Sequence, residues 1–266
     1  MKDKDHQQSK AQVMLNKVPE ITLFFWIIKI LCTTVGETGA DFLNTTLNFG
    51  LDGVTVIMGA LLVVTLVFQF KTKKYVPGIY WLAVVLISIV GTLITDNLTD
   101  RLGVPLSITT IIFAVLLSIV FAVWYKKEKT LSIHTIITTK RESFYWLAIL
   151  FTFALGTAAG DLLAETINLG YLLSAIIFGG LIASVAISHF VFKVNAILAF
   201  WIAYILTRPL GASIGDYLSQ DMSNGGLGLG TVMTSMIFLG TILATVIYLT
   251  VTKKDVLRKS NFGDSV

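Results

Sequence analysis

Four aspartates recur in this chain, each five residues after a glycine and close to the end of an apolar block. They are Asp41, Asp96, Asp161 and Asp216. Carboxylates brought close together attract cations and can share protons, so the pattern predicts a ring of acids that binds a cation or protons. The alternative is that each aspartate caps the following turn by accepting hydrogen bonds from loop N–H groups. The residue types leave both interpretations open.

Three further charges, Lys29, Glu37 and Arg208, lie inside apolar blocks where the equivalent repeat positions are mostly uncharged. A charge inside a membrane span costs about 2.5–3.5 kcal/mol unless it is paired or solvated. Our hypothesis is that Glu37 and Arg208 meet across a helix bundle, with Lys29 below them. The alternative is a purely structural ion pair that locks the helices together. These three charges and the four aspartates are the candidate ion-binding and transport residues.

The aspartates belong to a sequence unit that occurs four times without gaps. Each unit reads aromatic residue, Trp, then Gly ten residues after the Trp and Asp five after the Gly. The motif tryptophans are Trp26, Trp81, Trp146 and Trp201, and the motif glycines are Gly36, Gly91, Gly156 and Gly211. Glycines suit close helix crossing, and tryptophans suit an aromatic belt near one membrane boundary. We therefore expect both sets to be structural.

With these motifs the chain resembles bacterial membrane proteins built from four tandem repeats of unknown function, each with two transmembrane regions and a characteristic tryptophan. The resemblance extends from about Phe25 to Val251 and is carried by the four Trp-Gly-Asp constellations. It implies a bacterial integral membrane protein. It brings no established activity with it.

The elements that must position these residues follow from composition. The 266 residues are 55% hydrophobic and 14% charged, with a mean hydropathy of +0.81, whereas a soluble domain carries roughly 25% charged residues. A spanning helix needs about 20 apolar residues, and lipid leaves the backbone no other hydrogen-bond partners. We predict an all-α, polytopic membrane helical bundle with eight transmembrane helices in four tandem parallel two-helix repeats. The predicted spans are 21–41, 49–70, 77–96, 103–125, 143–164, 169–192, 195–217 and 227–251.

Each repeat returns the chain to its starting side, so the repeats are related by an axis along the membrane normal. Residues four apart drift only about 40° around a helix, so Lys29, Glu37 and Asp41 follow one stripe of the first span. Polar atoms that face lipid are costly. We therefore expect the polar stripes of the odd-numbered spans to face one another, around a pseudo-fourfold or double pseudo-twofold axis.

Basic residues predict the orientation. Seventeen of the 20 lysines and arginines lie on the side that holds both termini, so we expect cytoplasmic termini and a multi-pass protein of the cell (inner) membrane. The opposite loops carry acids that would form an acidic mouth and concentrate cations. The predicted organisation is an N-terminal tail (1–20), a first membrane half (21–125), a flexible cytoplasmic linker (126–142), a second membrane half (143–251) and a C-terminal tail (252–266).

The function predicted from these features is a transporter or channel for a cation or small cationic solute, with the lipid bilayer and a small cation or proton as partners. The alternative is a membrane scaffold, sensor or lipid-binding protein without transport activity. We expect no enzyme activity, since the sequence offers no nucleophile–base pair, paired histidines or phosphate-binding glycine loop. No cofactor or nucleic-acid partner is expected, because the net charge of +4 reflects the topology.

Overall fold

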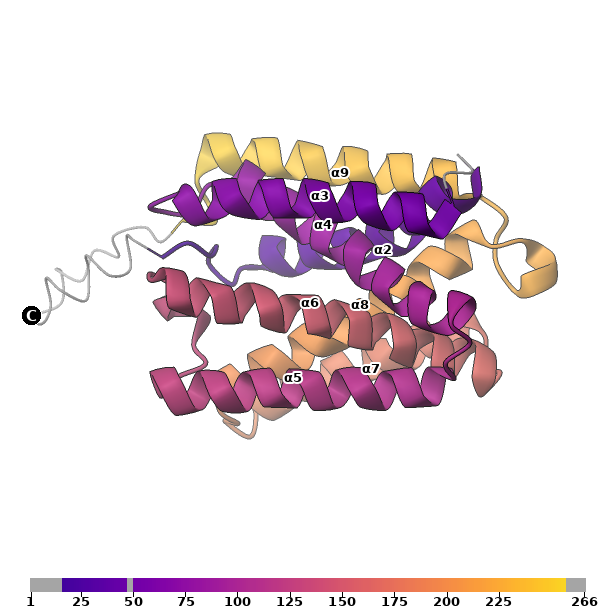
Figure 1. The fold of residues 1–266 in the computed structure, drawn as a ribbon. Helices are drawn as coiled ribbons and strands as arrows, with labels where there is room; N and C mark the ends of the chain where they lie inside the picture. The colour runs from indigo at the N-terminus through magenta and orange to yellow at the C-terminus, as the bar shows by residue number, and fades with distance from the viewer. Residues whose placement is uncertain (1–15, 47–49, 257–266) are drawn as a thin grey trace, which may run out of the picture.

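The computed structural model describes residues 16–46 and 50–256 (Figure 1). Within these residues, eight helices are long and apolar enough to cross a membrane. They are α2 (Leu23–Asp41), α3 (Gly50–Lys71), α4 (Pro77–Asp96), α5 (Leu106–Glu128), α6 (Thr139–Asp161), α7 (Tyr171–Phe190), α8 (Ala196–Ser219) and α9 (Thr231–Thr252). The predicted all-α bundle with eight spans is confirmed. Residues 1–15 and 257–266, most of the two predicted tails, lie outside the described residues.

Local chemistry explains where several helices begin. Thr22 precedes α2 and its side chain accepts a hydrogen bond from the backbone N–H of Phe25, and Thr138 does the same for α6. Asn195 accepts from two backbone N–H groups at the start of α8. These are side-chain caps of the first helical turn, a role that suits threonine and asparagine.

The helices fall into two classes by burial. We call α2, α4, α6 and α8 the inner helices. In each of them, between 56% and 72% of the most apolar 18-residue stretch is buried in the protein. In α3, α5, α7 and α9, the outer helices, only 11% to 28% is buried. Figure 1 shows the inner helices between α3 and α9 on one side and α5 and α7 on the other. The exposed apolar faces of the outer helices therefore suit contact with lipid.

The four inner helices form a closed ring. α2 packs against α4, α4 against α6, α6 against α8, and α8 returns to α2. Each outer helix packs chiefly on the inner helix of the following repeat: α3 on α4, α5 on α6, α7 on α8, and α9 on α2. The last repeat thus closes onto the first. The inner helices α2, α4, α6 and α8 are spans one, three, five and seven of the sequence prediction. They surround a common axis, as the sequence predicts.

The motif glycines lie at the contacts within this ring. A Cβ atom on Gly36 would overlap Ser88 of α4, and one on Gly91 would lie 2.7 Å from the Cβ of Phe153 on α6. The same overlap would occur between Gly156 and Arg208, and between Gly211 and Thr33. In every case the facing residue lies three positions before the next motif glycine. Close crossing therefore requires glycine in all four repeats.

The motif tryptophans lie in the same ring, at the bundle end we call the Trp end; three are buried and Trp26 is half-buried. The aromatic residue before each tryptophan packs on the tryptophan of the next inner helix, with 5.5 to 6.3 Å between ring centroids. The pairs are Phe25–Trp81, Tyr80–Trp146, Tyr145–Trp201 and Phe200–Trp26. Trp81, Trp146 and Trp201 are at most 4% exposed. Each of these three rings is enclosed by the neighbouring repeat, so it contributes to contacts between helices.

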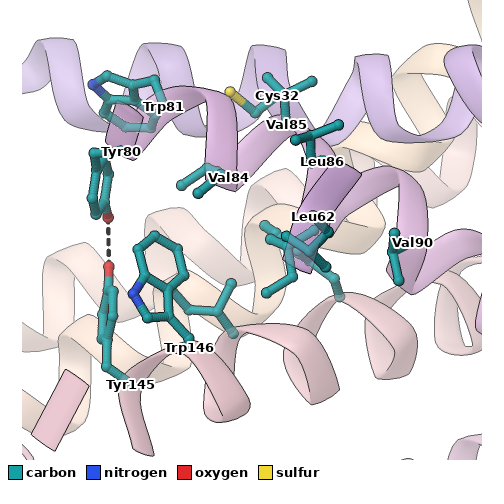
Figure 2. Close-up of a cluster of buried hydrophobic side chains, with 14 of the residues drawn as sticks. Cys32, Leu62, Tyr80, Trp81, Val84, Val85, Leu86, Val90, Tyr145 and Trp146 are labelled. Atoms are coloured by element: carbon teal, nitrogen blue, oxygen red, sulfur yellow. Dashed lines mark hydrogen bonds between the residues drawn. The ribbon is translucent and has the colours of Figure 1, made fainter. Parts of the chain in front are cut away.

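Figure 2 shows the Trp end of this core, where Tyr80 and Tyr145 join two inner helices through their hydroxyl groups. The hydroxyl oxygens are 2.5 Å apart. Both tyrosine side chains are fully buried. The hydrogen bond satisfies two polar groups that would otherwise be costly in an apolar layer.

The segment between the two halves is packed rather than loose. Ile133 and Ile136 are buried against the Trp end, and the Ile136 carbonyl accepts a hydrogen bond from the Lys17 N–H. Trp201 donates its indole N–H to the Leu131 carbonyl, at 2.9 Å. The part of the predicted linker (126–142) that lies between α5 and α6 is therefore packed against the bundle. Its two isoleucines bury apolar surface in this end of the bundle.

Buried polar groups also close the Trp end. Lys17 pairs with Glu142 at 2.6 Å and donates to the Phe70 carbonyl, and Gln69 donates to the second Glu142 oxygen. Tyr75 donates to Asp255 at 2.6 Å. Burial and the neighbouring Asp255 carboxylate raise the pKa of Tyr75, so the tyrosine stays protonated and keeps donating.

Candidate functional site

The aspartates lie inside continuous helices. α2, α4 and α6 each continue beyond the motif aspartate into a π-helical turn, at Phe42–Thr46, Asn97–Arg101 and Leu162–Thr166. α8 continues beyond Asp216 to Ser219. The regular α-helical parts of α2, α4 and α6 thus end at the aspartate, and the chain stays helical for one more turn. Within the described residues, the side chains of Asp96 and Asp161 make no capping hydrogen bond with that turn, so the capping alternative is wrong at these two positions. Such π-helical segments break the regular ladder and are frequent at functional sites.

Arg208 occupies the centre of the ring and is fully buried. Its terminal Nη2 donates to Glu37 at 2.9 Å and to Thr157 at 2.6 Å, and it also contacts the Thr92 hydroxyl. Its Nη1 approaches the Thr33 carbonyl at 3.4 Å. One arginine of the fourth repeat therefore reaches side chains of the other three.

The repeat register explains this arrangement. Glu37, Thr92 and Thr157 are equivalent residues, each directly after a motif glycine, and the fourth repeat has Ala212 there. Arg208 lies one helical turn before Ala212, and its Cβ and Cγ atoms fill the space beside Gly156. The absence of a side chain at Gly156 therefore makes room for the arginine stem. Its guanidinium extends into the layer of the three equivalent side chains.

Several carboxylates converge near the Arg208 guanidinium, at the end of the bundle opposite the Trp end. We call this end the Asp end. One carboxylate oxygen each from Glu37, Asp161 and Asp216 lies within 4.8 Å of the other two. Asp41 and Asp96 are close enough to interact electrostatically with Glu37. Glu37 and Asp216 are each 7% exposed, while Asp41, Asp96 and Asp161 are partly exposed. The cluster thus lies at the edge of the buried interior.

The chemistry of this acid cluster suits a hard cation or protons. Oxygen ligands from carboxylates are those preferred by such cations, and Glu37, Asp161 and Asp216 could each supply one. The guanidinium of Arg208 is bonded to Glu37 of this cluster. One positive charge cannot balance several ionised carboxylates at this separation. Additional cations or protons would lower the repulsion among them.

Lys29 lies on the opposite side of Arg208, towards the Trp end. Its side chain is fully buried, and its Nζ lies 4.0 Å from the ring centroid of Phe153 and 4.2 Å from that of Tyr204. Within the described residues, the ammonium has no hydrogen-bond partner. Its interactions are cation–π contacts, which are strongest where water is excluded.

All seven charged candidates lie on the inner helices, as the stripe pattern predicts. Glu37 and Arg208 meet across the bundle, and Lys29 lies below them without joining the pair. The motif tryptophans and glycines lie in the surrounding helix contacts.

Sequence reasoning missed Thr92 and Thr157 as partners of Arg208, and Phe153 and Tyr204 as partners of Lys29. The signal for the threonines was available, because the repeat alignment makes them equivalent to Glu37. Phe153 and Tyr204 also lie on the inward stripes, eight residues before Asp161 and twelve before Asp216, but the spacing does not show that their rings meet Lys29. These contacts depend on how the helices are rotated in the ring.

Comparison with known proteins identifies the repeat and leaves the activity open. The family described as Repeat of Unknown Function (DUF347) matches residues 24–75, 79–130, 144–195 and 199–255. These four segments cover most of the chain and coincide with the four two-helix units of the structure. Neither a curated protein nor a solved structure gives a significant match.

Proposed function

We propose that this chain, which belongs to the repeat family of unknown function matched by its four segments, is a membrane transporter or channel for a cation or small cationic solute. Its eight apolar helices suit a lipid bilayer. The observation that carries the proposal is the convergence of the Glu37, Asp161 and Asp216 carboxylates at the Asp end, with the Arg208 guanidinium bonded to Glu37. In this proposal the excess negative charge binds the cation.

The proposed path runs along the ring axis. A cation enters at the partly exposed aspartates and reaches Glu37, where the Arg208 guanidinium blocks direct passage towards the aromatic layer. Movement of Arg208 away from Glu37 is the step that connects the acid cluster with the Trp end. Buried ionisable residues in membrane spans commonly mark such paths.

The test is flux through the purified protein in sealed vesicles. We expect wild-type protein to carry at least one member of a panel of alkali, divalent and organic cations, with and without a pH gradient. Glu37→Gln should reduce the flux at least about tenfold while leaving the protein folded, since it removes the carboxylate that the cation and Arg208 share.

The matched control is Asp52→Asn, which removes an exposed carboxylate on outer helix α3 at the Asp end. It should leave the flux within about twofold of wild type, because exposed pairs contribute little. If folded wild-type protein carries no cation of the panel, or if Glu37→Gln transports normally, the proposal is wrong.

The proposed orientation has the Trp end and both termini in the cytoplasm of a bacterial cell, because the lysine and arginine residues concentrate there. Single-cysteine labelling can test it, because the native Cys32 is fully buried. An impermeant thiol reagent should label a cysteine at exposed Asp221 from outside intact cells and one at exposed Lys74 only after lysis. The reverse pattern would contradict the orientation.

The second candidate function is a membrane scaffold or lipid-binding protein. The observation that favours it is the closed Trp end, where Tyr80 and Tyr145 are hydrogen-bonded and the aromatic rings pack without interruption around the ring. In that case the Glu37–Arg208 pair only locks the helices. The flux assay separates the two functions, because a scaffold would give no cation-dependent signal.

A further inference from the structure

The Arg208 guanidinium fits its surroundings imperfectly. Three oxygens surround its Nη2 nitrogen: those of Glu37 at 2.9 Å, of Thr157 at 2.6 Å, and of the Thr92 hydroxyl. This nitrogen carries two hydrogens. At most two of the three oxygens can therefore receive a well-directed hydrogen bond from it at one time.

The rest of the guanidinium shows the same mismatch. Within the described residues, its Nε is buried and has no hydrogen-bond partner. Among these residues, its Nη1 reaches one acceptor, the Thr33 carbonyl at 3.4 Å. A receptor shaped for a planar guanidinium would offer acceptors along both edges of the fork. Here three of the four acceptors gather around Nη2.

The two threonines present their oxygen lone pairs to this point. Thr92 donates its hydroxyl hydrogen to the Ser88 carbonyl at 3.3 Å, and Thr157 donates to the Phe153 carbonyl at 3.2 Å. Each hydroxyl therefore faces the centre as an acceptor. With Glu37, they form a site of three acceptor oxygens and one negative charge, one ligand from each of three repeats.

We propose that Glu37, Thr92 and Thr157 form a binding site for a primary ammonium cation, and that the Arg208 side chain is its tethered occupant. A primary ammonium carries three N–H donors, so it can satisfy all three oxygens at once. Arg208 holds the site closed until it is displaced. The role of Arg208 in closing the site rests on the proposed transport function. The existence of the binding site does not rest on it.

The site can be tested by emptying it. Arg208→Ala removes the occupant and leaves the three oxygen ligands in place. Methylammonium chloride should then raise the midpoint of thermal unfolding of the purified variant by about 3 °C near saturation, because a ligand that binds only the folded state stabilises it. Tetramethylammonium chloride at the same concentration has no N–H donor and should give no rise.

Two controls tie the effect to the site. Wild-type protein should not respond to methylammonium, because Arg208 fills the site, and the double variant Glu37→Gln/Arg208→Ala should not respond, because the carboxylate is gone. Absence of a methylammonium effect in Arg208→Ala overturns the site. An equal or larger rise with guanidinium overturns the assignment to a primary ammonium.

If Arg208→Ala unfolds on extraction, recovery replaces the midpoint as the readout. At least roughly twofold more monodisperse protein should be obtained in methylammonium than in tetramethylammonium, by the same linkage. Equal recovery overturns the site.

Flux measured on the wild-type preparation separates the two proposals. If methylammonium stabilises Arg208→Ala but the wild-type protein carries no cation, the binding site is supported and the transport function is wrong. If the wild-type protein carries a cation but methylammonium does not stabilise Arg208→Ala, the binding site is wrong.

Discussion

Replacing Gly211 with valine is expected to destabilise the protein by about 3 kcal/mol or more, or to prevent recovery of folded monomer. Gly211 lies where α8 meets α2, and an added Cβ would overlap the Thr33 side chain and lie 3.1 Å from the Thr34 backbone nitrogen. Backbone cannot move aside as a flexible side chain can, so the two helices would have to separate. Thermal unfolding and size-exclusion profiles in detergent would measure the effect.

The matched control for this substitution is Gly179→Val on outer helix α7. A Cβ at Gly179 meets no atom within 4 Å, so the same change there should shift stability by less than about 1 kcal/mol. A folded Gly211→Val variant with the wild-type unfolding midpoint would contradict the closed ring. An equal loss of stability in both variants would indicate that replacing a helix glycine with valine is destabilising at either position, whether or not the glycine lies at a helix contact.

The second large effect is expected from breaking the buried ion pair. Arg208→Gln leaves the buried Glu37 carboxylate without its counter-charge beside Asp161 and Asp216, and should cost about 3–5 kcal/mol. The double variant Glu37→Gln/Arg208→Gln should recover a large part of that loss, because it removes the unpaired charge. A double-mutant cycle of unfolding free energies gives the coupling.

An exposed pair at the Asp end provides the comparison. Arg101 and Asp52 form an ion pair with exposed side chains, and Arg101→Gln should cost less than about 1 kcal/mol. If the Glu37 and Arg208 substitutions proved additive, the two side chains would not interact energetically, and the central role of Arg208 in the ring would have to be abandoned.

The ion pair is compatible with both candidate functions. A pair that only locks the helices and a pair that must open for transport both predict loss of stability when one partner is removed. They differ in what Glu37→Gln does to flux, and in whether the site left by Arg208→Ala accepts an external ammonium. Stability measurements therefore establish the structural contribution, and the flux and ligand measurements assign the function.

The sequence by itself determined the number of helices, their limits to within four residues, and the repeat register. Lipid cannot satisfy backbone hydrogen bonds, so apolar blocks of this length become helices whatever their neighbours are. The fixed distance from Trp to Gly to Asp places Glu37, Thr92 and Thr157 at equivalent heights on their helices. The inward direction of the polar stripes followed from the cost of polar atoms in lipid.

Only the tertiary structure decided which repeats touch and which atoms meet. The packing of α8 on α2 closes the ring, and the contacts between repeats bury three of the four tryptophans that the sequence predicts near a membrane boundary. The π-helical turns extend α2, α4 and α6 beyond their aspartates, and the stem of Arg208 beside Gly156 brings the guanidinium to Glu37. These features depend on helix rotation and on contacts between distant segments, and neither is encoded in hydrophobic periodicity.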